Sequence, residues 1–360
     1  MIAGVIGAAG YAGAELVRLL SGHKRIKSLS LGTVSLEGER IENVYPNFLG
    51  KVSCPLVKPE EVIAASDIVF SALPHGVGEC YAKACLERGI SFIDLSADFR
   101  FGEDEGTFKA WYGKPYVYPK LRERSVYGLP ELNRERIKAL AASGPLIIAN
   151  PGCYPTGATL GILPAQAEGL ALPTGTIIVD SASGVTGGGR EPQRSFHFPE
   201  CSDSMTAYKV GTHRHQPEIS RNLQAIAELS GRPTLPLIFT PHLAPMNRGI
   251  LSTIYIPIKA IGVSCMRSKL EDIWKLHAQF YEGEPFVRVL PQGFFASTGR
   301  VRHSNFCDIS VHLDPTADTL IVVTAIDNMV KGAAGQAVQN MNLVFGFEEN
   351  EGLEAIPALF

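Results

Sequence analysis

A cysteine stands between two contrasting segments near the middle of the chain. Leu146 to Ala149 is an apolar run that predicts a buried strand, and Asn150-Pro151-Gly152 ends it. The segment 156–167 is rich in Ala and Leu and predicts a helix, with Pro155 near its first turn. Cys153 is therefore expected before a helix N-terminus, where backbone N–H groups and the helix dipole stabilise a thiolate and an oxyanion. The pattern favours a nucleophile, although a buried cysteine packed as a small apolar side chain fits the same stretch.

A pair of histidines is the second candidate for chemistry. His213 and His215 are two positions apart, so on a strand their side chains face the same way and Arg214 faces the other, available to an anion. Histidine is a common acid–base partner of a cysteine nucleophile. The pair also fits a zinc site, but the sequence shows no evident cluster of further ligands, so we expect no metal. Two surface histidines near a helix start are the remaining alternative, and the pattern does not say which histidine exchanges a proton.

The elements that must position this chemistry begin with a glycine loop. Ile2 to Ile6 predicts a strand, glycines follow in a G-x-x-G-x-x-G pattern, and 15–20 predicts a helix ended by Gly22. This order forms a phosphate-binding turn, in which the backbone and the helix N-terminus face a pyrophosphate. A plain tight turn is the alternative. The residues expected to contact a dinucleotide here are Gly7, Ala9, Gly10, Tyr11, Ala12 and Gly13.

The next predicted strand, 26–31, bears on which dinucleotide binds. NAD-preferring sites usually carry an acidic residue after this strand, where it binds the ribose 2′-hydroxyl. This chain has Thr33 and Ser35 there, with Arg40 further along. Hydroxyl groups and a cation suit a 2′-phosphate, so we expect NADP(H) rather than NAD(H). The alternative is that Glu37 fills the acidic role.

Strands and helices then alternate. Strands are predicted at 67–73 and 90–95, with a helix at 77–88 between them, and this alternation predicts a doubly wound, parallel, Rossmann-type sheet. Ligands of such sheets bind beyond the carboxyl ends of the strands, where 96–100 follows the second of these strands. We interpret 101–130, which is rich in Tyr, Gly, Pro and charge, as a long loop over the crevice. Further residues expected at the cofactor are Ser71, Pro74 and His75.

The second half of the chain has more strands than helices. We predict strands at 176–180, 235–240, 249–258, 286–290, 305–313 and 319–326, and an amphipathic helix at 264–281. This pattern is typical of an α+β domain with a largely antiparallel, mixed sheet. A wide sheet face of this kind can pair two subunits, so we expect a homo-oligomer. Three glycines precede Arg190 in a loop whose amides would bind an anion, unless the loop is only a flexible connector.

A helix rich in small residues is predicted after Asp327, and we expect it to return to the first domain. We therefore assign 1–150 and 328–360 to a dinucleotide-binding domain, and 151–327 to a catalytic and oligomerisation domain.

Composition limits the class of protein. The chain has 360 residues, 45% of them hydrophobic and 19% charged, which indicates a globular protein with two cores of ordinary size. The net charge of −3 favours neither nucleic acid nor a membrane surface as a partner. Seven scattered cysteines with no C-x-x-C pair favour a reducing compartment. The start of the chain lacks the pattern of a signal peptide, and no apolar run is long enough to span a bilayer, so we expect a cytoplasmic protein.

These stretches together resemble the N-acetyl-γ-glutamyl-phosphate reductase family, within the aspartate-semialdehyde dehydrogenase superfamily. The resemblance covers nearly the whole chain. It is most specific at 150–156 and 213–219, and 241–249 and 327–337 also match. The chain departs from the family where the usual G-A-T-G-Y-T-G loop has Ala9 and Ala12 in place of the two threonines, so side-chain bonds to a pyrophosphate are lost there. Gln216 replaces the family's usual Thr or Ser in the histidine motif, a change with no evident explanation.

The resemblance implies NADPH-dependent reduction of N-acetyl-L-glutamyl 5-phosphate in arginine biosynthesis, through a thioester. It implies that Cys153 is the nucleophile and that one of His213 and His215 is the acid–base. His215 is favoured because its distance from the preceding residues resembles that in the superfamily. Asn328 would meet the nicotinamide carboxamide, and Gly184 would contact the cofactor. Candidates for substrate binding are Arg100, Ser183, Arg190, Arg214, Glu218 and Arg248.

Other functions are compatible with parts of this pattern. An aspartate-semialdehyde dehydrogenase, or a lysine-pathway reductase of a carrier-bound acyl phosphate, would use the same chemistry on a different substrate. A nucleotide-sensing protein would bind NADP(H) without catalysis. Such a sensor needs neither Cys153 nor the two histidines, so replacing Cys153 by serine would leave its function intact.

Overall fold

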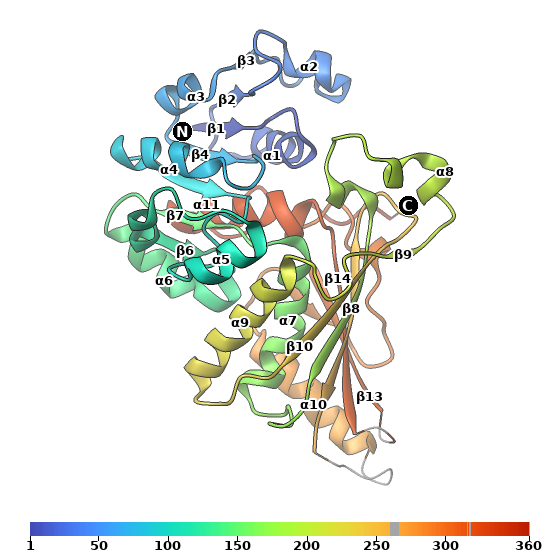
Figure 1. The fold of residues 1–360 in the computed structure, drawn as a ribbon. Helices are drawn as coiled ribbons and strands as arrows, with labels where there is room; N and C mark the ends of the chain where they lie inside the picture. The colour runs from blue at the N-terminus through green and yellow to red at the C-terminus, as the bar shows by residue number, and fades with distance from the viewer. Residues whose placement is uncertain (260–265, 315, 317, 360) are drawn as a thin grey trace. The chain divides into compact units, whose positions relative to one another are not determined.

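A computed structural model describes residues 1–259, 266–314, 316 and 318–359, which form two compact units (Figure 1). The first unit comprises Met1–Gly152 and Ala333–Ala355, and the second comprises Cys153–Gly332 and the described residues after Ala355. The C-terminal segment of the chain thus contributes a helix to the unit that the N-terminal half builds.

The first unit is built on a seven-stranded sheet in the order β3-β2-β1-β4-β5-β7-β6. Its strands are β1 (Ile2–Ile6), β2 (Ser28–Gly32), β3 (Leu56–Val57), β4 (Ile68–Ser71), β5 (Ser91–Asp94), β6 (Ser125–Tyr127) and β7 (Ile147–Ala149). Every neighbouring pair is parallel. The order reverses at β1, which lies between β2 and β4, and ligands of doubly wound sheets bind at such a reversal. The predicted doubly wound, parallel sheet is confirmed.

The helices of this unit bury residues against the rest of the unit, and all but the last in the chain lie between two of its strands. They are α1 (Tyr11–Ser21), α2 (Ile41–Val44), α3 (Pro59–Ala65), α4 (Gly78–Glu87), α5 (Glu105–Tyr112), α6 (Pro130–Ala142) and α11 (Gly335–Val344), with short 3-10 turns η1 (Pro46–Phe48) and η2 (Pro119–Arg124). The strands β4 and β5 are buried along their whole length, which requires cover on both faces of the sheet.

The interpretation of 101–130 as one long loop is wrong, because the segment contains α5, η2 and β6. The side chain of Asp104 accepts a hydrogen bond from the N–H of Thr107 at 3.0 Å and caps the start of α5. Gly113 ends the helix with a φ of 72°, a conformation that glycine adopts without strain. The aromatic residues that resembled loop composition pack instead into a small core that includes Phe101 and Phe108.

The helix α11 is buried along almost its whole length within the first unit. The helix contacts α1, α6 and β5. Asn342 bonds to the His23 ring at 2.9 Å, and Asn340 donates to the carbonyl oxygen of Gly128 at 2.8 Å. A side chain at Gly128 would collide with Asn340 and Ile148, so glycine is required for this close approach.

The second unit contains a seven-stranded mixed sheet in the order β12-β13-β14-β11-β8-β10-β9. Its strands are β8 (Ile177–Ser183), β9 (Thr206–Ala207), β10 (Leu237–Leu243), β11 (Ile250–Pro257), β12 (Val287–Val289), β13 (Cys307–Asp314) and β14 (Thr319–Ile326). The pairs β8–β10 and β12–β13 are parallel and the others antiparallel. This confirms the predicted α+β class with a largely antiparallel, mixed sheet.

Helices cover one face of this sheet. They are α7 (Cys153–Ala167), α9 (His215–Ser230) and α10 (Met266–Phe280), which contact its strands. Other helical segments are α8 (Phe198–Cys201), the 3-10 turns η3 (Val185–Gly188), η4 (Arg194–Phe196) and η6 (Thr298–Arg300), and the π-helical turn η7 (Val330–Ala334). Residues 264 and 265, where the predicted helix begins, lie outside the described residues. The helix α7 contacts β11 and β14 directly, because Gly161 leaves no side chain between them: a Cβ there would lie 2.8 Å from Thr324.

Candidate active site

Cys153 is the first residue of α7, and its side chain is half-buried. The helix begins at Cys153 rather than at Thr156, because Pro155 in the first turn has no N–H to lose there. The first N–H groups of α7 lack partners within the helix, so the sulfur lies at the positive end of its dipole. Gly332 leaves room for this cysteine, since a Cβ on Gly332 would lie 2.8 Å from the Cβ of Cys153.

The two histidines lie in a turn at the start of a helix, so the strand geometry in which they would face the same way does not apply. His213 precedes the helix α9 and His215 is its first residue, with Arg214 at the N-cap position. The backbone N–H of His215 donates to Nδ1 of His213 at 3.1 Å, which bends the chain. The two ring centres lie 4.8 Å apart with an angle of 66° between the ring planes. The two rings therefore lie against each other because of this turn.

Two tyrosines that the sequence analysis overlooked complete this group. Tyr154, the residue after Cys153, packs its ring edge-on against His213 at 5.6 Å and against His215 at 5.8 Å. The hydroxyl groups of Tyr154 and Tyr208 share a hydrogen bond of 3.0 Å. Tyr154 thus joins the start of α7, which carries Cys153, to the start of α9. Its place beside the cysteine was the only signal in the sequence.

Burial sets the protonation of these groups. Burial, then the charges of Lys209 and Arg214, lowers the pKa of His213 to about 4. Burial raises the pKa of Tyr208 to about 12, and burial with the neighbouring Tyr208 raises that of Tyr154. Near neutral pH the ring of His213 is therefore uncharged, and both phenols keep their protons.

The second unit gathers other predicted residues at the end of β8. Ser183 is buried and its hydroxyl donates to the carbonyl oxygen of Gly184 at 3.1 Å. A side chain at Gly184 would collide with the backbone of Asn247, with a Cβ 2.6 Å from its carbonyl oxygen. Asn328 is held from two sides: its Oδ1 accepts from the N–H of Gly249 at 2.7 Å, and its Nδ2 donates to Thr186 at 3.0 Å.

In the first unit, the three glycines of the glycine loop lie in different surroundings, so a side chain would have a different effect at each. Gly7 has a φ of 86°, and a Cβ there would lie 2.6 Å from the carbonyl oxygen of Ala72. A Cβ on Gly13 would lie 2.8 Å from the Cα of Ala8, so this glycine allows α1 to pack on the loop. Gly10, the N-cap of α1, is open: a Cβ there would meet only the oxygen of Gly7, at 3.4 Å. The helix N-terminus behind Gly10 has no side-chain cap, so the loop fits a pyrophosphate group.

Family models and relatives identify the chain. The model "Semialdehyde dehydrogenase, NAD binding domain" matches residues 2–140, and "Semialdehyde dehydrogenase, dimerisation domain" matches residues 153–328. An N-acetyl-gamma-glutamyl-phosphate reductase of Clostridium kluyveri is 48% identical over 358 residues, which cover 99% of both chains. This chain belongs to the N-acetyl-gamma-glutamyl-phosphate reductase family. A member of that family from Brachyspira hyodysenteriae is 42% identical, again over 99% of both chains.

Solved structures of the semialdehyde dehydrogenases share the fold. The aspartate semialdehyde dehydrogenase II of Vibrio cholerae has a TM-score of 0.70 and 16% identity, covering 96% of this chain and 98% of its own. The aspartate semialdehyde dehydrogenase with NADP from Candida albicans has a TM-score of 0.66 and 17% identity, covering 97% of this chain and 99% of its own. At these identities the likeness concerns the fold alone.

Two of the four arginines expected to bind the substrate form ion pairs or hydrogen bonds with other residues of the chain. Arg248 forms an ion pair of 3.1 Å with the buried carboxylate of Asp327. Arg100 is buried in the first unit and donates to the carbonyl oxygens of Asn150 at 2.9 Å and Leu95 at 2.7 Å.

The other two arginines and a glutamate lie in the second unit. The side chain of Arg190 is exposed, that of Arg214 is half-buried, and Glu218 is buried in the first turn of α9. A carboxylate in this position interacts favourably with the helix dipole.

The residues that follow β2 are the candidates for discrimination between NADP(H) and NAD(H). The hydroxyl oxygen of Thr33 accepts from the N–H groups of Ser35 at 3.2 Å and Leu36 at 3.3 Å, which fixes the turn. The side chain of Ser35 is exposed. Arg40 is also exposed, and its guanidinium pairs with Glu42 at 2.8 Å and bonds to Ser53. The alternative acidic residue, Glu37, is exposed and faces Lys58 at 3.6 Å.

The loop between β4 and α4 carries the remaining cofactor candidates. Ser71 ends β4 and is buried, Pro74 is exposed, and Nδ1 of His75 accepts from the N–H of Ala97 at 3.0 Å. The carboxylate of Asp98 accepts from the N–H groups of Gly76 at 2.6 Å and Gly78 at 3.0 Å. The turn after β5 therefore holds this loop at the carboxyl ends of the strands.

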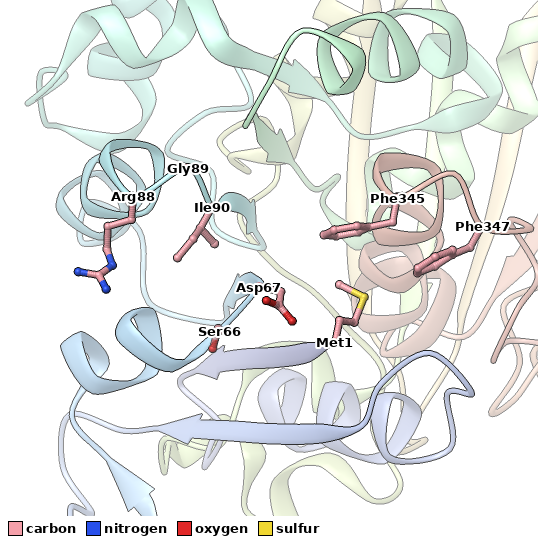
Figure 2. Close-up of a pocket in the computed structure, with 8 residues that line it drawn as sticks. All are labelled: Met1, Ser66, Asp67, Arg88, Gly89, Ile90, Phe345 and Phe347. Atoms are coloured by element: carbon pink, nitrogen blue, oxygen red, sulfur yellow. The ribbon is translucent and has the colours of Figure 1, made fainter.

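A separate pocket lies at the amino ends of the strands of the same sheet, opposite the loops that follow β4 and β5 (Figure 2). Its lining residues are Met1, Ser66, Asp67, Arg88, Gly89, Ile90, Phe345 and Phe347. They include the residues just before β1, β4 and β5, so the pocket lies at the amino ends of these strands. Two of its polar groups bind within the chain: the Asp67 carboxylate accepts from the N–H of Ile2 at 2.7 Å, and the Met1 ammonium donates to the carbonyl oxygen of Arg25 at 2.9 Å. We assign no ligand to it.

Within the described ranges of the chain, no three His, Cys, Asp or Glu side chains gather in a way that would hold a metal ion. In the same ranges, no helix is long and apolar enough to cross a membrane.

Proposed function

We propose that the chain catalyses the NADPH-dependent reduction of N-acetyl-L-glutamyl 5-phosphate to N-acetyl-L-glutamate 5-semialdehyde and phosphate, a step of arginine biosynthesis. The observation that carries this proposal is a ring contact between two helix starts. Tyr154, which follows Cys153 at the beginning of α7, packs its ring against His215 at the beginning of α9. The relatives at 42–48% identity over 99% of the chain bear the name of this reductase.

The chemistry begins at sulfur. The Cys153 thiolate attacks the acyl carbon, the C–S bond forms, and the bond to phosphate breaks, which gives a thioester. NADPH, when bound, supplies the hydride that reduces the thioester carbon. His215 then gives a proton to the oxygen of the resulting thiohemiacetal. His215 takes this proton back as the C–S bond breaks, which releases the semialdehyde and restores the thiolate.

We assign the cofactor to the first unit. Gly7, Gly10 and Gly13 form the pyrophosphate cradle, and the loss of the two hydroxyls at Ala9 and Ala12 leaves backbone contacts there. NADP(H) is preferred over NAD(H), since the turn after β2 presents hydroxyls and a cation. The residues that contribute besides the glycines are Ala9, Tyr11, Ala12, Thr33, Ser35, Arg40, Ser71, Pro74 and His75. Gly184 and Asn328 are further candidates for cofactor contacts, as the family resemblance implies.

We assign substrate binding to Ser183, Glu218, Arg190 and Arg214. The two arginines have side chains that reach the surface or lie near it, which suits the phosphate and carboxylate of the substrate. Arg248 and Arg100 act instead by fixing Asp327 and the ends of β5 and β7, because their guanidinium groups already bind there.

We propose further that the protein is a cytoplasmic homo-oligomer that pairs through the sheet of the second unit. On the face opposite α7, Ile178 and Ile238 are 37% and 51% exposed in neighbouring strands. A partner subunit would remove these apolar side chains from water. The family model that matches this unit is described as a dimerisation domain.

The reverse reaction tests the activity. Purified protein receives N-acetyl-L-glutamate 5-semialdehyde, phosphate and NADP⁺, and NADPH formation is followed by absorbance. We expect a rate that requires all three compounds and is lost in Cys153→Ser. A rate only with aspartate semialdehyde would reassign the substrate. Binding of NADP(H) with no turnover of any semialdehyde would support the sensor instead.

A further inference from the structure

We infer that His213 is a positioning residue, kept neutral, whose Nδ1 caps the start of α9 and fixes the ring of His215 against Tyr154. Proton exchange then belongs to His215 alone. This inference rests on the proposed function, and it is carried by the hydrogen bond and the ring contacts around His213.

The first observation is the direction of one hydrogen bond. Nδ1 of His213 accepts from the backbone N–H of His215 at 3.1 Å. Arg214 occupies the N-cap of α9 and makes no side-chain cap of its own, so His213 supplies an acceptor for the first helical N–H. Asn, Asp or Ser commonly perform this task at helix starts. An imidazole can accept at Nδ1 only when that nitrogen carries no proton, which fixes the neutral form with the proton on Nε2.

The second observation is what surrounds the His213 ring. It is 9% exposed and meets the rings of Tyr154 at 5.6 Å, Tyr208 at 5.4 Å and Phe239 at 5.4 Å, all edge-on. The charged groups that act on it are Lys209 and Arg214, both cations. A second proton on His213 would break the bond to His215, place a charge among aromatic rings and add repulsion from two cations.

His215 is more exposed than His213. Its side chain is half-buried, and its ring packs against the rings of Tyr154 and His213. The backbone of His215 is fixed by the hydrogen bond to His213, and its ring is fixed by packing on Tyr154. The position of His215 relative to Cys153 therefore depends on His213, although His213 itself need not contact the reacting atoms.

Two substitutions separate a cap from an acid–base group. His213→Asn retains a side-chain oxygen that can accept the same N–H but cannot titrate, and His213→Phe retains a ring with no acceptor. For His213→Asn we expect kcat to fall by about tenfold at most, the effect of a weakened cap. For His213→Phe we expect a fall on the order of 10²-fold, through misplacement of His215. In both variants the acidic limb of the kcat pH profile should keep the wild-type pKa.

His215→Asn is the comparison variant. It should lose about 10²–10⁴-fold in kcat and lose the histidine limb of the pH profile. The inference is overturned if kcat falls as far in His213→Asn as in His215→Asn. It is also overturned if the acidic limb of the kcat pH profile disappears in His213→Asn. His197→Asn, at an exposed histidine of the same unit, controls for the substitution itself.

A spectroscopic readout keeps this inference distinct from the proposed function. In the intact wild-type protein labelled with ¹⁵N-histidine, the signals absent from the His213→Asn spectrum belong to His213. We expect them to report the neutral form with the proton on Nε2 from pH 8 down to pH 5.5. Protonation of His213 above pH 6 would refute the inference even if the reductase assay succeeds. A neutral His213 in a protein without reductase activity would refute only the proposed function.

Discussion

The space beside Cys153 provides a sharp test, because one methyl group at Gly332 should disturb it. A Cβ on Gly332 would lie 2.8 Å from the Cβ and 3.2 Å from the Cα of Cys153. Non-bonded carbon atoms prefer about 3.5–4.0 Å. In Gly332→Ala the start of α7 must therefore move by about 1 Å. Displacements of this size at a reacting group cost on the order of 10²-fold in rate.

The assay measures kcat of the reductase together with the rate at which iodoacetamide alkylates Cys153. Overpacking by one methyl group costs about 1–3 kcal/mol in stability, so a matched control is needed. Gly175→Ala offers one, since its Cβ would lie 2.9 Å from the Cβ of Pro257. Gly175 precedes β8, and Pro257 is the last residue of β11, the strand that pairs with β8. This contact lies at the opposite end of the strand pair from Ser183.

We expect both variants to lose similar stability, and only Gly332→Ala to lose kcat and change the alkylation rate. The reasoning is refuted if Gly332→Ala loses stability as Gly175→Ala does while keeping the wild-type kcat. It is also refuted if the control loses kcat to the same extent.

Two further outcomes follow from the first unit. Arg40→Ala should raise KM for NADPH by about tenfold and leave KM for NADH unchanged, because removing a charge-assisted contact to the 2′-phosphate costs about 1.5 kcal/mol. Equal changes in the two KM values would rule out this role of Arg40. Burial, then the neighbouring Asp98, raises the pKa of Asp94 from its ordinary 3.8 to about 7. A raised native pKa means that the folded state holds the proton more tightly, so Asp94 contributes stability below pH 4 that is lost as the pH rises to about 7. Asp94→Asn should therefore lose less stability than the wild type in urea unfolding between pH 5 and pH 8, and parallel losses in the two proteins would contradict this.

The parts of the fold that depend on local sequence could be predicted. The strand, the glycines and the helix at the start of the chain are adjacent, and Gly7 and Gly13 are each required by close backbone contacts at their own positions. The alternation of strands and helices likewise predicted the parallel sheet. The helix α5 was missed because its aromatic residues resemble loop composition, and because Gly113 was not interpreted as the end of a helix.

The candidate site was only partly readable, because its parts meet through contacts between distant segments. The types of Cys153 and the two histidines pointed to the chemistry. The period of two suggested a strand, but a side-chain hydrogen bond between His213 and His215 makes a turn. No spacing shows that Tyr154 reaches Tyr208.

The arginines show the same limit. An arginine near predicted site residues in the sequence can bind either a substrate or a buried carboxylate or carbonyl group of the protein itself. Arg248 pairs with Asp327, which lies on a different strand end, and only the three-dimensional structure reveals this partner.

The central claim is that the sulfur of Cys153 forms a thioester with the acyl group. The most direct measurement mixes the protein with N-acetyl-L-glutamyl 5-phosphate in the absence of NADPH, then quenches in acid and locates the adduct by peptide mass spectrometry. The account predicts one equivalent of phosphate released per active site and an N-acetylglutamyl group on the peptide that contains Cys153. Phosphate release without an adduct, or an adduct on another cysteine that persists in Cys153→Ser, would contradict it.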